Sequence, residues 1–125
     1  MTSPTVLVVD DDPDMQMLSR VILEDAGFRV LATGDGDHAL ELFTDERVDL
    51  VLLDVKLPGI DGWELLEKLQ AGADGDARVV MFSAHVSDED RDKATAGGSR
   101  GYVTKPFQAA DLVATVRAAI GAEPA

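Results

Sequence analysis

Near its N-terminus the chain reads Val6-Leu7-Val8-Val9-Asp10-Asp11-Asp12-Pro13, an unbroken apolar run followed at once by three acidic residues and a proline. Unbroken runs rich in Val and Leu are typical of strands in a parallel sheet that is covered on both faces. Asp12 followed by Pro13 is typical of a helix N-cap with proline at the first helical position. The stretch therefore predicts a buried strand that leads directly into a helix, with Asp10 and Asp11 at the junction.

Four further short segments of this kind follow, separated by patterns with apolar residues three and four positions apart, as in amphipathic helices. We expect strands at Thr5–Val9, Phe28–Thr33, Leu50–Leu53, Val79–Phe82 and Tyr102–Thr104. The second and fifth are more polar, which suits the edges of a sheet. Five strands alternating with five helices predict a doubly wound α/β domain with a parallel sheet and right-handed crossovers. We place this domain at residues 4–121, with a short tail at 122–125.

Composition excludes several classes of site. The chain has 125 residues, enough for one domain, and no cysteine, which rules out disulfides and thiolate metal centres. With only His38 and His85, a site of several histidines is also excluded. The formal net charge of −13 should repel nucleic acid and anionic membranes. No secretory signal or membrane span is visible, so we expect a cytoplasmic protein.

Polar residues follow four of the five expected strands. Asp10 and Asp11 follow the first, Asp54 the third, Ser83 the fourth and Lys105 the fifth. Ligands bind such sheets at the carboxyl ends of the strands, so these side chains should share one crevice. Three crowded carboxylates repel one another, so either some are protonated or a cation neutralises them, and a site made of oxygen ligands favours Mg²⁺ or Mn²⁺. With a lysine and a hydroxyl to hold phosphate oxygens, the set predicts a phosphoryl-transfer site with Asp54 as nucleophile.

The same stretches resemble the receiver domain of two-component response regulators, of the kind found in chemotaxis regulators. The motifs that carry the resemblance are Val6–Asp12, Leu52–Gly62, Met81–Ala84 and Gly101–Phe107. They occur in the family's order and the resemblance covers residues 4–121. It implies a flavodoxin-like (βα)5 fold with strand order 2-1-3-4-5, and a phosphorylation-dependent signalling switch, either in a two-component system or in a phosphorelay.

The resemblance also implies roles for individual residues. Asp54 would accept a phosphoryl group from a phosphohistidine of a histidine kinase or histidine phosphotransfer protein. Asp10 and Asp11 would hold Mg²⁺ together with Asp54 and the backbone carbonyl of Lys56, with Asp10 acting through water. Lys105 would pair with one phosphoryl oxygen.

Further positions would transmit or time the signal. Ser83 would bond another phosphoryl oxygen, and Tyr102 would be an aromatic switch that turns inward as Ser83 moves. The bond between Lys105 and Pro106 would be a cis peptide. Lys56 and His85 stand where receivers set the rate of phosphoryl loss, although both are equally well explained as solvated loop side chains.

Such a domain is regulatory rather than an enzyme, because it promotes only its own phosphotransfer and dephosphorylation. We expect a downstream protein to bind the face formed by the fourth helix, the fifth strand and the last helix, with no direct contact to nucleic acid or membrane. The fourth helix, at Asp88–Gly97, has only alanines as apolar residues and should be the least stable. The chain is then either a stand-alone regulator or a domain excised from a longer one, and the short tail slightly favours a single-domain regulator or a phosphorelay intermediate.

Parts of the same pattern also occur in three other classes of protein. A haloacid-dehalogenase-type phosphatase would need Thr or Val where Asp14 stands, and the chain leaves no room for a substrate cap. A calcium loop starting at Asp10 would need glycine in place of Met15 and glutamate in place of Val21. A receiver-like binding module that is not phosphorylated stays open as an alternative.

Overall fold

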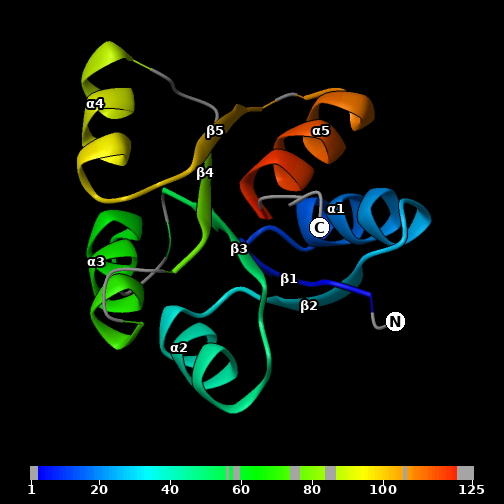
Figure 1. Cartoon of the computed structure of the whole chain (residues 1–125), viewed down its shortest axis with the longest axis horizontal. Coiled ribbons are helices and arrows are strands. Elements are labelled where there is room, and N and C mark those ends of the chain that lie inside the picture. The colour runs from blue at the N-terminus through cyan, green and yellow to red at the C-terminus, as the bar shows by residue number, and fades with distance from the viewer. Residues whose placement is uncertain are drawn as a thin grey trace.

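The fold is a five-stranded sheet with helices on both faces, shown in Figure 1. This computed structural model describes residues 3–55, 57, 60–73, 77–83, 87–105 and 107–120. In chain order the elements are β1 (Thr5–Val9), α1 (Pro13–Asp25), β2 (Arg29–Thr33), α2 (Gly36–Asp45), β3 (Leu50–Asp54), α3 (Gly62–Gly72), β4 (Val79–Ser83), α4 (Asp88–Ala96), β5 (Gly101–Thr104) and α5 (Ala109–Ile120). All neighbouring strands are parallel and their order is β2-β1-β3-β4-β5, which confirms the fold class and the strand order.

The sheet divides the hydrophobic core in two. Alternate strand residues point to opposite faces, so Val8 belongs to the half of the core that α1 and α5 cover, whereas Leu7 belongs to the half that α2, α3 and α4 cover. Every residue of β1, β3 and β4 is buried. The three unbroken apolar runs in the sequence are therefore the three inner strands. The more polar β2 and β5 lie at the edges, as predicted.

The strand boundaries differ from the sequence prediction by one residue each after β1. Phe28 is part of the capping motif that follows α1 and not of β2, because its backbone N–H donates to the Leu23 carbonyl at 3.0 Å. Gly27 has φ of +98° and its N–H donates to the Glu24 carbonyl, which completes a Schellman motif. β3 and β4 extend to Asp54 and Ser83, and β5 begins at Gly101, since the ladder pairs these residues with neighbouring strands.

Two expected helix starts are confirmed. Asp12 caps α1 by accepting a hydrogen bond from the Asp14 N–H at 2.9 Å, and Pro13 is the first helical residue. Ser87 caps α4 through a hydrogen bond from the Asp90 N–H at 3.0 Å. α4 ends at Ala96, one residue before the expected boundary.

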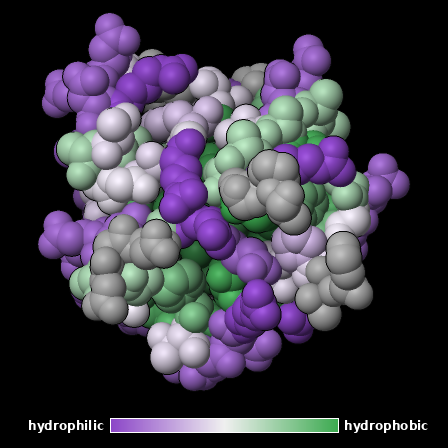
Figure 2. Space-filling model, viewed as in Figure 1, coloured by the Kyte–Doolittle hydropathy of each residue, from purple (hydrophilic) through white to green (hydrophobic). Residues whose placement is uncertain are grey.

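In the described part of the chain, no helix combines the length and the apolar character that a bilayer crossing requires. Figure 2 shows hydrophilic residues in a band across the middle of one face, with more apolar areas beside it. The tail expected at 122–125 lies outside the described residues. The boundaries 4–121 stay a prediction.

Candidate functional site

Three carboxylates meet at the carboxyl edge of the sheet. Asp10 follows β1 and Asp54 ends β3, and these two strands are neighbours at the middle of the sheet. Asp11 is the next residue along the chain. One carboxylate oxygen from each residue lies within 4.8 Å of the others. Asp10 and Asp54 are buried while Asp11 is exposed, so the cluster opens to solvent on the side of Asp11.

Lys105 joins two of these carboxylates across the sheet. Its Nζ lies 2.7 Å from Asp10 Oδ2 and 3.3 Å from Asp54 Oδ2. The Lys105 backbone N–H donates to the Ser83 carbonyl at 2.8 Å, and its Nζ lies 4.4 Å from the centre of the Phe82 ring. The end of β5 is therefore tied to the end of β4, which sets where the ammonium group lies.

The site has a net negative charge, which favours the binding of a divalent cation. Burial lowers the pKa of Lys105, but the hydrogen bond and charge of Asp10, together with Asp54, outweigh it and hold the pKa above its usual 10.5. The lysine is thus a permanent ammonium ion at neutral pH. With all three carboxylates ionised, the cluster and this ammonium carry two net negative charges. Oxygen ligands in this arrangement are those that Mg²⁺ prefers.

The backbone around Asp10 is held on several sides. Its N–H donates to the Thr33 carbonyl at 3.0 Å, and its Oδ1 accepts the Asp12 N–H at 3.0 Å. Its carbonyl accepts a hydrogen bond from Gln16 Nε2 at 2.6 Å. The sequence identifies Asp10 but not Thr33 or Gln16. Thr33 ends β2 and acts here through its backbone carbonyl, and Gln16 lies within α1, so neither contact has a sequence pattern of its own.

Ser83 and Tyr102 are brought together beside Asp54. Burial is the main cause that raises the pKa of Tyr102, followed by the charge of Asp90; a hydrogen bond with Ser83 lowers it in part. The guanidinium carbon of Arg91 lies 5.8 Å from the Tyr102 ring centre. The tyrosine therefore contacts both the end of β4 and helix α4.

Gly62, the first residue of α3, packs closely against the strand that carries Asp54. A side-chain carbon at this position would lie 2.5 Å from the Asp54 carbonyl oxygen and 2.6 Å from that of Val55. The Gly62 N–H donates to the Val55 carbonyl at 2.9 Å. This contact sets the path of the chain after β3, and the sequence prediction had treated the glycine only as part of a motif.

The structure thus brings together five of the predicted site residues, Asp10, Asp11, Asp54, Ser83 and Lys105, and places Tyr102 beside them. The predictions for Lys56, His85 and Pro106 fall outside the described residues.

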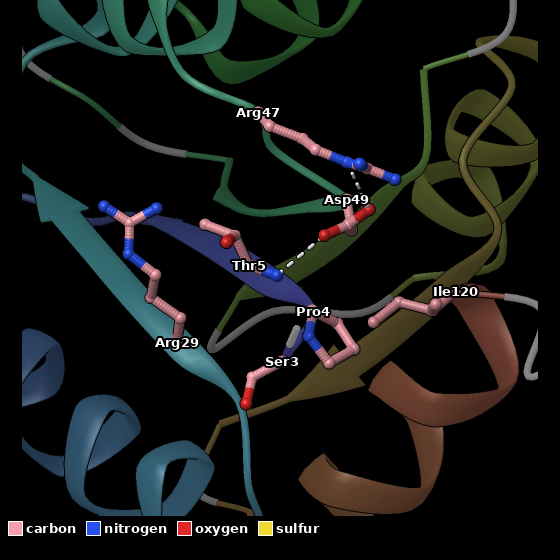
Figure 3. A pocket seen from close by; sticks show the side chains of 7 residues that line it. All are labelled: Ser3, Pro4, Thr5, Arg29, Arg47, Asp49 and Ile120. Atoms are coloured by element: carbon pink, nitrogen blue, oxygen red, sulfur yellow. Dashed lines mark hydrogen bonds and ion pairs between the residues drawn. The ribbon is translucent and has the colours of Figure 1, made fainter. Parts of the chain in front are cut away.

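A cavity of about 620 Å³ lies at the opposite edge of the sheet (Figure 3). In it the Asp49 carboxylate accepts a hydrogen bond from the Thr5 N–H at 2.8 Å and lies 3.9 Å from Arg47 Nε. The lining residues are Ser3, Pro4, Thr5, Arg29, Arg47, Asp49 and Ile120. Since β1 separates this cavity from Asp10, it takes no part in the carboxylate site.

Comparison with known proteins identifies the family to which this fold belongs. The model of the response regulator receiver domain matches residues 6–117, so the chain belongs to this family. Among solved structures, the chemotaxis protein CheY4 of Vibrio cholerae is similar with a TM-score of 0.89 and 27% identity, covering 94% of this chain and 99% of that one. A CheY-like receiver domain from Methanospirillum hungatei has a TM-score of 0.88 and 28% identity, covering 95% and 94% of the two chains.

Curated relatives are longer proteins. The transcriptional regulatory protein PrrA of Mycobacterium tuberculosis is 41% identical over 118 residues, which cover 94% of this chain and 50% of the relative. The DNA-binding response regulator MtrA of Mycolicibacterium smegmatis is 40% identical over 113 residues, which cover 90% and 49% of the two chains. The chain spans about half the length of these relatives. The receiver family assignment leaves the phosphatase hypothesis without support.

Proposed function

We propose that this domain is a switch that accepts a phosphoryl group on Asp54 from a phosphohistidine of a histidine kinase or a histidine phosphotransfer protein. The observation that carries the proposal is the convergence of three carboxylates and one ammonium group at the carboxyl edge of the sheet. Asp54 is the candidate nucleophile because it ends a central strand, with Lys105 on its Oδ2.

The step forms one bond and breaks one. An Asp54 carboxylate oxygen attacks phosphorus, and the bond between phosphorus and the donor imidazole nitrogen breaks. The electron pair of that bond returns to the imidazole, which takes up a proton. Lys105 stabilises the negative charge on the transferred oxygens, and the Ser83 hydroxyl donates to another of them.

Mg²⁺ fits the donor set, since the site offers carboxylate oxygens and two unbalanced negative charges. Asp10, Asp11 and Asp54 would hold it, with the Lys56 carbonyl as the fourth protein ligand that family resemblance suggests. When bound, the ion supplies positive charge that offsets repulsion between the carboxylates and the phosphoryl group; Mn²⁺ would serve in the same way.

Phosphorylation would reach a partner through Ser83 and Tyr102. A Ser83 hydroxyl drawn toward the phosphoryl oxygens changes its hydrogen bond with Tyr102, and Tyr102 in turn contacts Arg91 of α4. The face formed by α4, β5 and α5 would present this change to a downstream protein. The domain would act on no other substrate: water attack on phosphorus would release inorganic phosphate and restore Asp54, at a rate set partly by Lys56 and His85. The cytoplasmic location expected from the sequence stays a prediction.

Incubation with Mg²⁺ and acetyl phosphate, followed by intact mass spectrometry, tests the proposal. We expect an adduct of one phosphoryl group that depends on Mg²⁺ and is absent in Asp54→Ala. Asp61→Ala is the matched control, because Asp61 caps α3 through the Trp63 N–H and is exposed. An unmodified parent protein would favour the binding module that is not phosphorylated, and sustained hydrolysis of phosphomonoesters would favour a phosphatase.

A further inference from the structure

Gln16 makes a short hydrogen bond to the backbone of the carboxylate site. Its Nε2 donates to the Asp10 carbonyl oxygen at 2.6 Å, from a position one turn into α1. Gln16 itself is half-buried. Among the described residues, this side chain is the donor that the structure records for that carbonyl.

The bonded peptide connects the two metal-ligand candidates. β1 pairs with its neighbours only as far as Val9, opposite Thr33 and Leu53, so the Asp10 carbonyl lies beyond the sheet ladder. The side chain of Asp10 has its own partners, Lys105 and the Asp12 N–H. Asp11 is exposed, and the direction of its side chain depends on the orientation of the peptide that precedes it.

The loop after β2 lies close to the same peptide at Gly34. A side-chain carbon on Gly34 would lie 3.1 Å from Asp11 Cα, 3.3 Å from the Asp10 carbonyl oxygen and 3.4 Å from Gln16 Nε2. The two distances to the Asp10–Asp11 backbone are tighter than ordinary van der Waals contact, so residue 34 has little space for a side chain. Gly34 and Gln16 thus enclose the peptide between Asp10 and Asp11 from two elements.

We propose that Gln16 is a positioning residue for the metal site, which holds the Asp10–Asp11 peptide so that the Asp11 carboxylate faces Asp54. The inference rests on the proposed function, because it concerns the same Mg²⁺ site. Residues that orient metal ligands without touching the ion commonly change affinity by about tenfold or more when they are replaced. Gln16 acts in this way through the backbone.

The test compares Gln16→Met, which keeps the length of the side chain and removes the donor, with Gln108→Met at an exposed position before α5. Mg²⁺ affinity is measured from the rise in melting temperature with Mg²⁺ concentration. We expect Gln16→Met to weaken Mg²⁺ binding about tenfold, Gly34→Ala to weaken it as well, and Gln108→Met to leave it unchanged. The two site variants should combine less than additively, because both act on one peptide.

A second measurement is made on the metal-free protein, by NMR. In the metal-free parent, NMR should detect scalar coupling between Gln16 Nε2 and the Asp10 carbonyl carbon across the hydrogen bond. If Gln16→Met lowers the melting temperature equally with and without Mg²⁺, Gln16 is only structural and the inference is wrong. A missing coupling together with unchanged affinity would also overturn it. No Mg²⁺ response in the parent would contradict the proposed metal site itself, and this inference with it.

Discussion

Asp11 differs from the other two carboxylates in how its charge is balanced. Asp10 and Asp54 share the ammonium group of Lys105, whereas among the described residues the structure records no ion pair for Asp11. Its charge therefore adds repulsion to the metal-free protein and attraction to a bound cation. This makes Asp11 the residue at which the two effects can be separated.

We expect Asp11→Asn to raise the melting temperature of the metal-free protein by a few degrees and to reduce the further rise caused by millimolar Mg²⁺. The first effect follows from removing repulsion and the second from losing a ligand. Thermal denaturation followed by circular dichroism measures both. Asp14→Asn, in the first turn of α1, is the control and should keep the Mg²⁺ response. An unchanged response in Asp11→Asn would show that Asp11 is not a ligand.

A substitution of Ser83 can separate the change at Tyr102 from the acceptance of a phosphoryl group on Asp54. We expect Ser83→Ala to accept a phosphoryl group on Asp54, because the hydroxyl is not the nucleophile, but to lose the change at Tyr102. In the unphosphorylated variant the pKa of Tyr102 should rise further above 10.0, since the Ser83 hydrogen bond that lowers it is gone. Tyr102 is the one tyrosine of the chain, so its absorbance at alkaline pH reports this directly.

NMR of Tyr102 with and without phosphorylation completes the experiment. The parent should show a change in the ring signals that Ser83→Ala lacks. The same change in both proteins would contradict the role of Ser83 as the link.

At the scale of elements, the junction between β3 and α3 depends on Gly62. We expect Gly62→Ala to destabilise the protein by about 2–3 kcal/mol, because the added carbon overlaps backbone atoms of Asp54 and Val55 that cannot move independently. Gly72→Ala is the matched control: nothing lies within 4 Å of the added carbon, and alanine stabilises a helix by about 0.5 kcal/mol over glycine. Urea denaturation measures both. If the Gly62→Ala and Gly72→Ala proteins are equally stable, the junction between β3 and α3 is not tightly packed.

Helix α4 has the weakest attachment to the core. Ala94 is its one buried residue, whereas α5 buries Leu112, Val116 and Ala119. Two cations of α4, Arg91 and Lys93, also lie 5.8 and 5.2 Å from aromatic ring centres, contacts worth about 0.5–1 kcal/mol each when exposed. An element held this loosely can be shifted by a small change at Tyr102.

We therefore expect amide hydrogen exchange across α4 to be faster than across α5 and to change most when the phosphate mimic beryllofluoride is added with Mg²⁺. Exchange is followed by mass spectrometry of peptides, with α2, on the same face of the sheet, as the internal reference. Protection equal to that of α5 and unaffected by the mimic would contradict this view of α4.

At the scale of the whole molecule, one sheet supports both halves of the core. Leu52 lies in the half under α1 and α5, and Leu53 in the half under α2, α3 and α4. Both are fully buried. Because the same strands line both halves, loss of packing on one face removes support from the other.

We expect Leu52→Ala and Leu53→Ala each to destabilise the protein by about 2–5 kcal/mol and to unfold in a single transition. Trp63 fluorescence reports the side of α3, and far-ultraviolet circular dichroism reports the whole chain. The two transitions should coincide in both variants. A fluorescence midpoint that moves only in Leu53→Ala would show that the two halves unfold separately.

Local chemistry in the sequence was sufficient for the elements and for most of the site. Apolar runs identified the buried inner strands, Asp12 identified the start of the first helix, and polar residues after the runs identified the carboxylate edge. These features are local, since they depend on neighbours within one strand or one helical turn. The strand order was known in advance only through family resemblance, because pairing joins segments that are distant in the chain.

The remaining features of the fold and the site depend on contacts between segments that are distant in the chain. The place of Phe28 in the cap after α1 depends on a hydrogen bond to the Leu23 carbonyl, which forms only when Gly27 adopts its positive φ. The salt bridges of Lys105 join residues 95 and 51 positions apart, and the role we infer for Gln16 depends on its side chain reaching back to the end of β1. The sequence by itself predicted which residues carry the chemistry. The tertiary structure decided which of them share an ion pair, a hydrogen bond or a rigid backbone, because those interactions exist only when the sheet brings separate strand ends within a few ångströms.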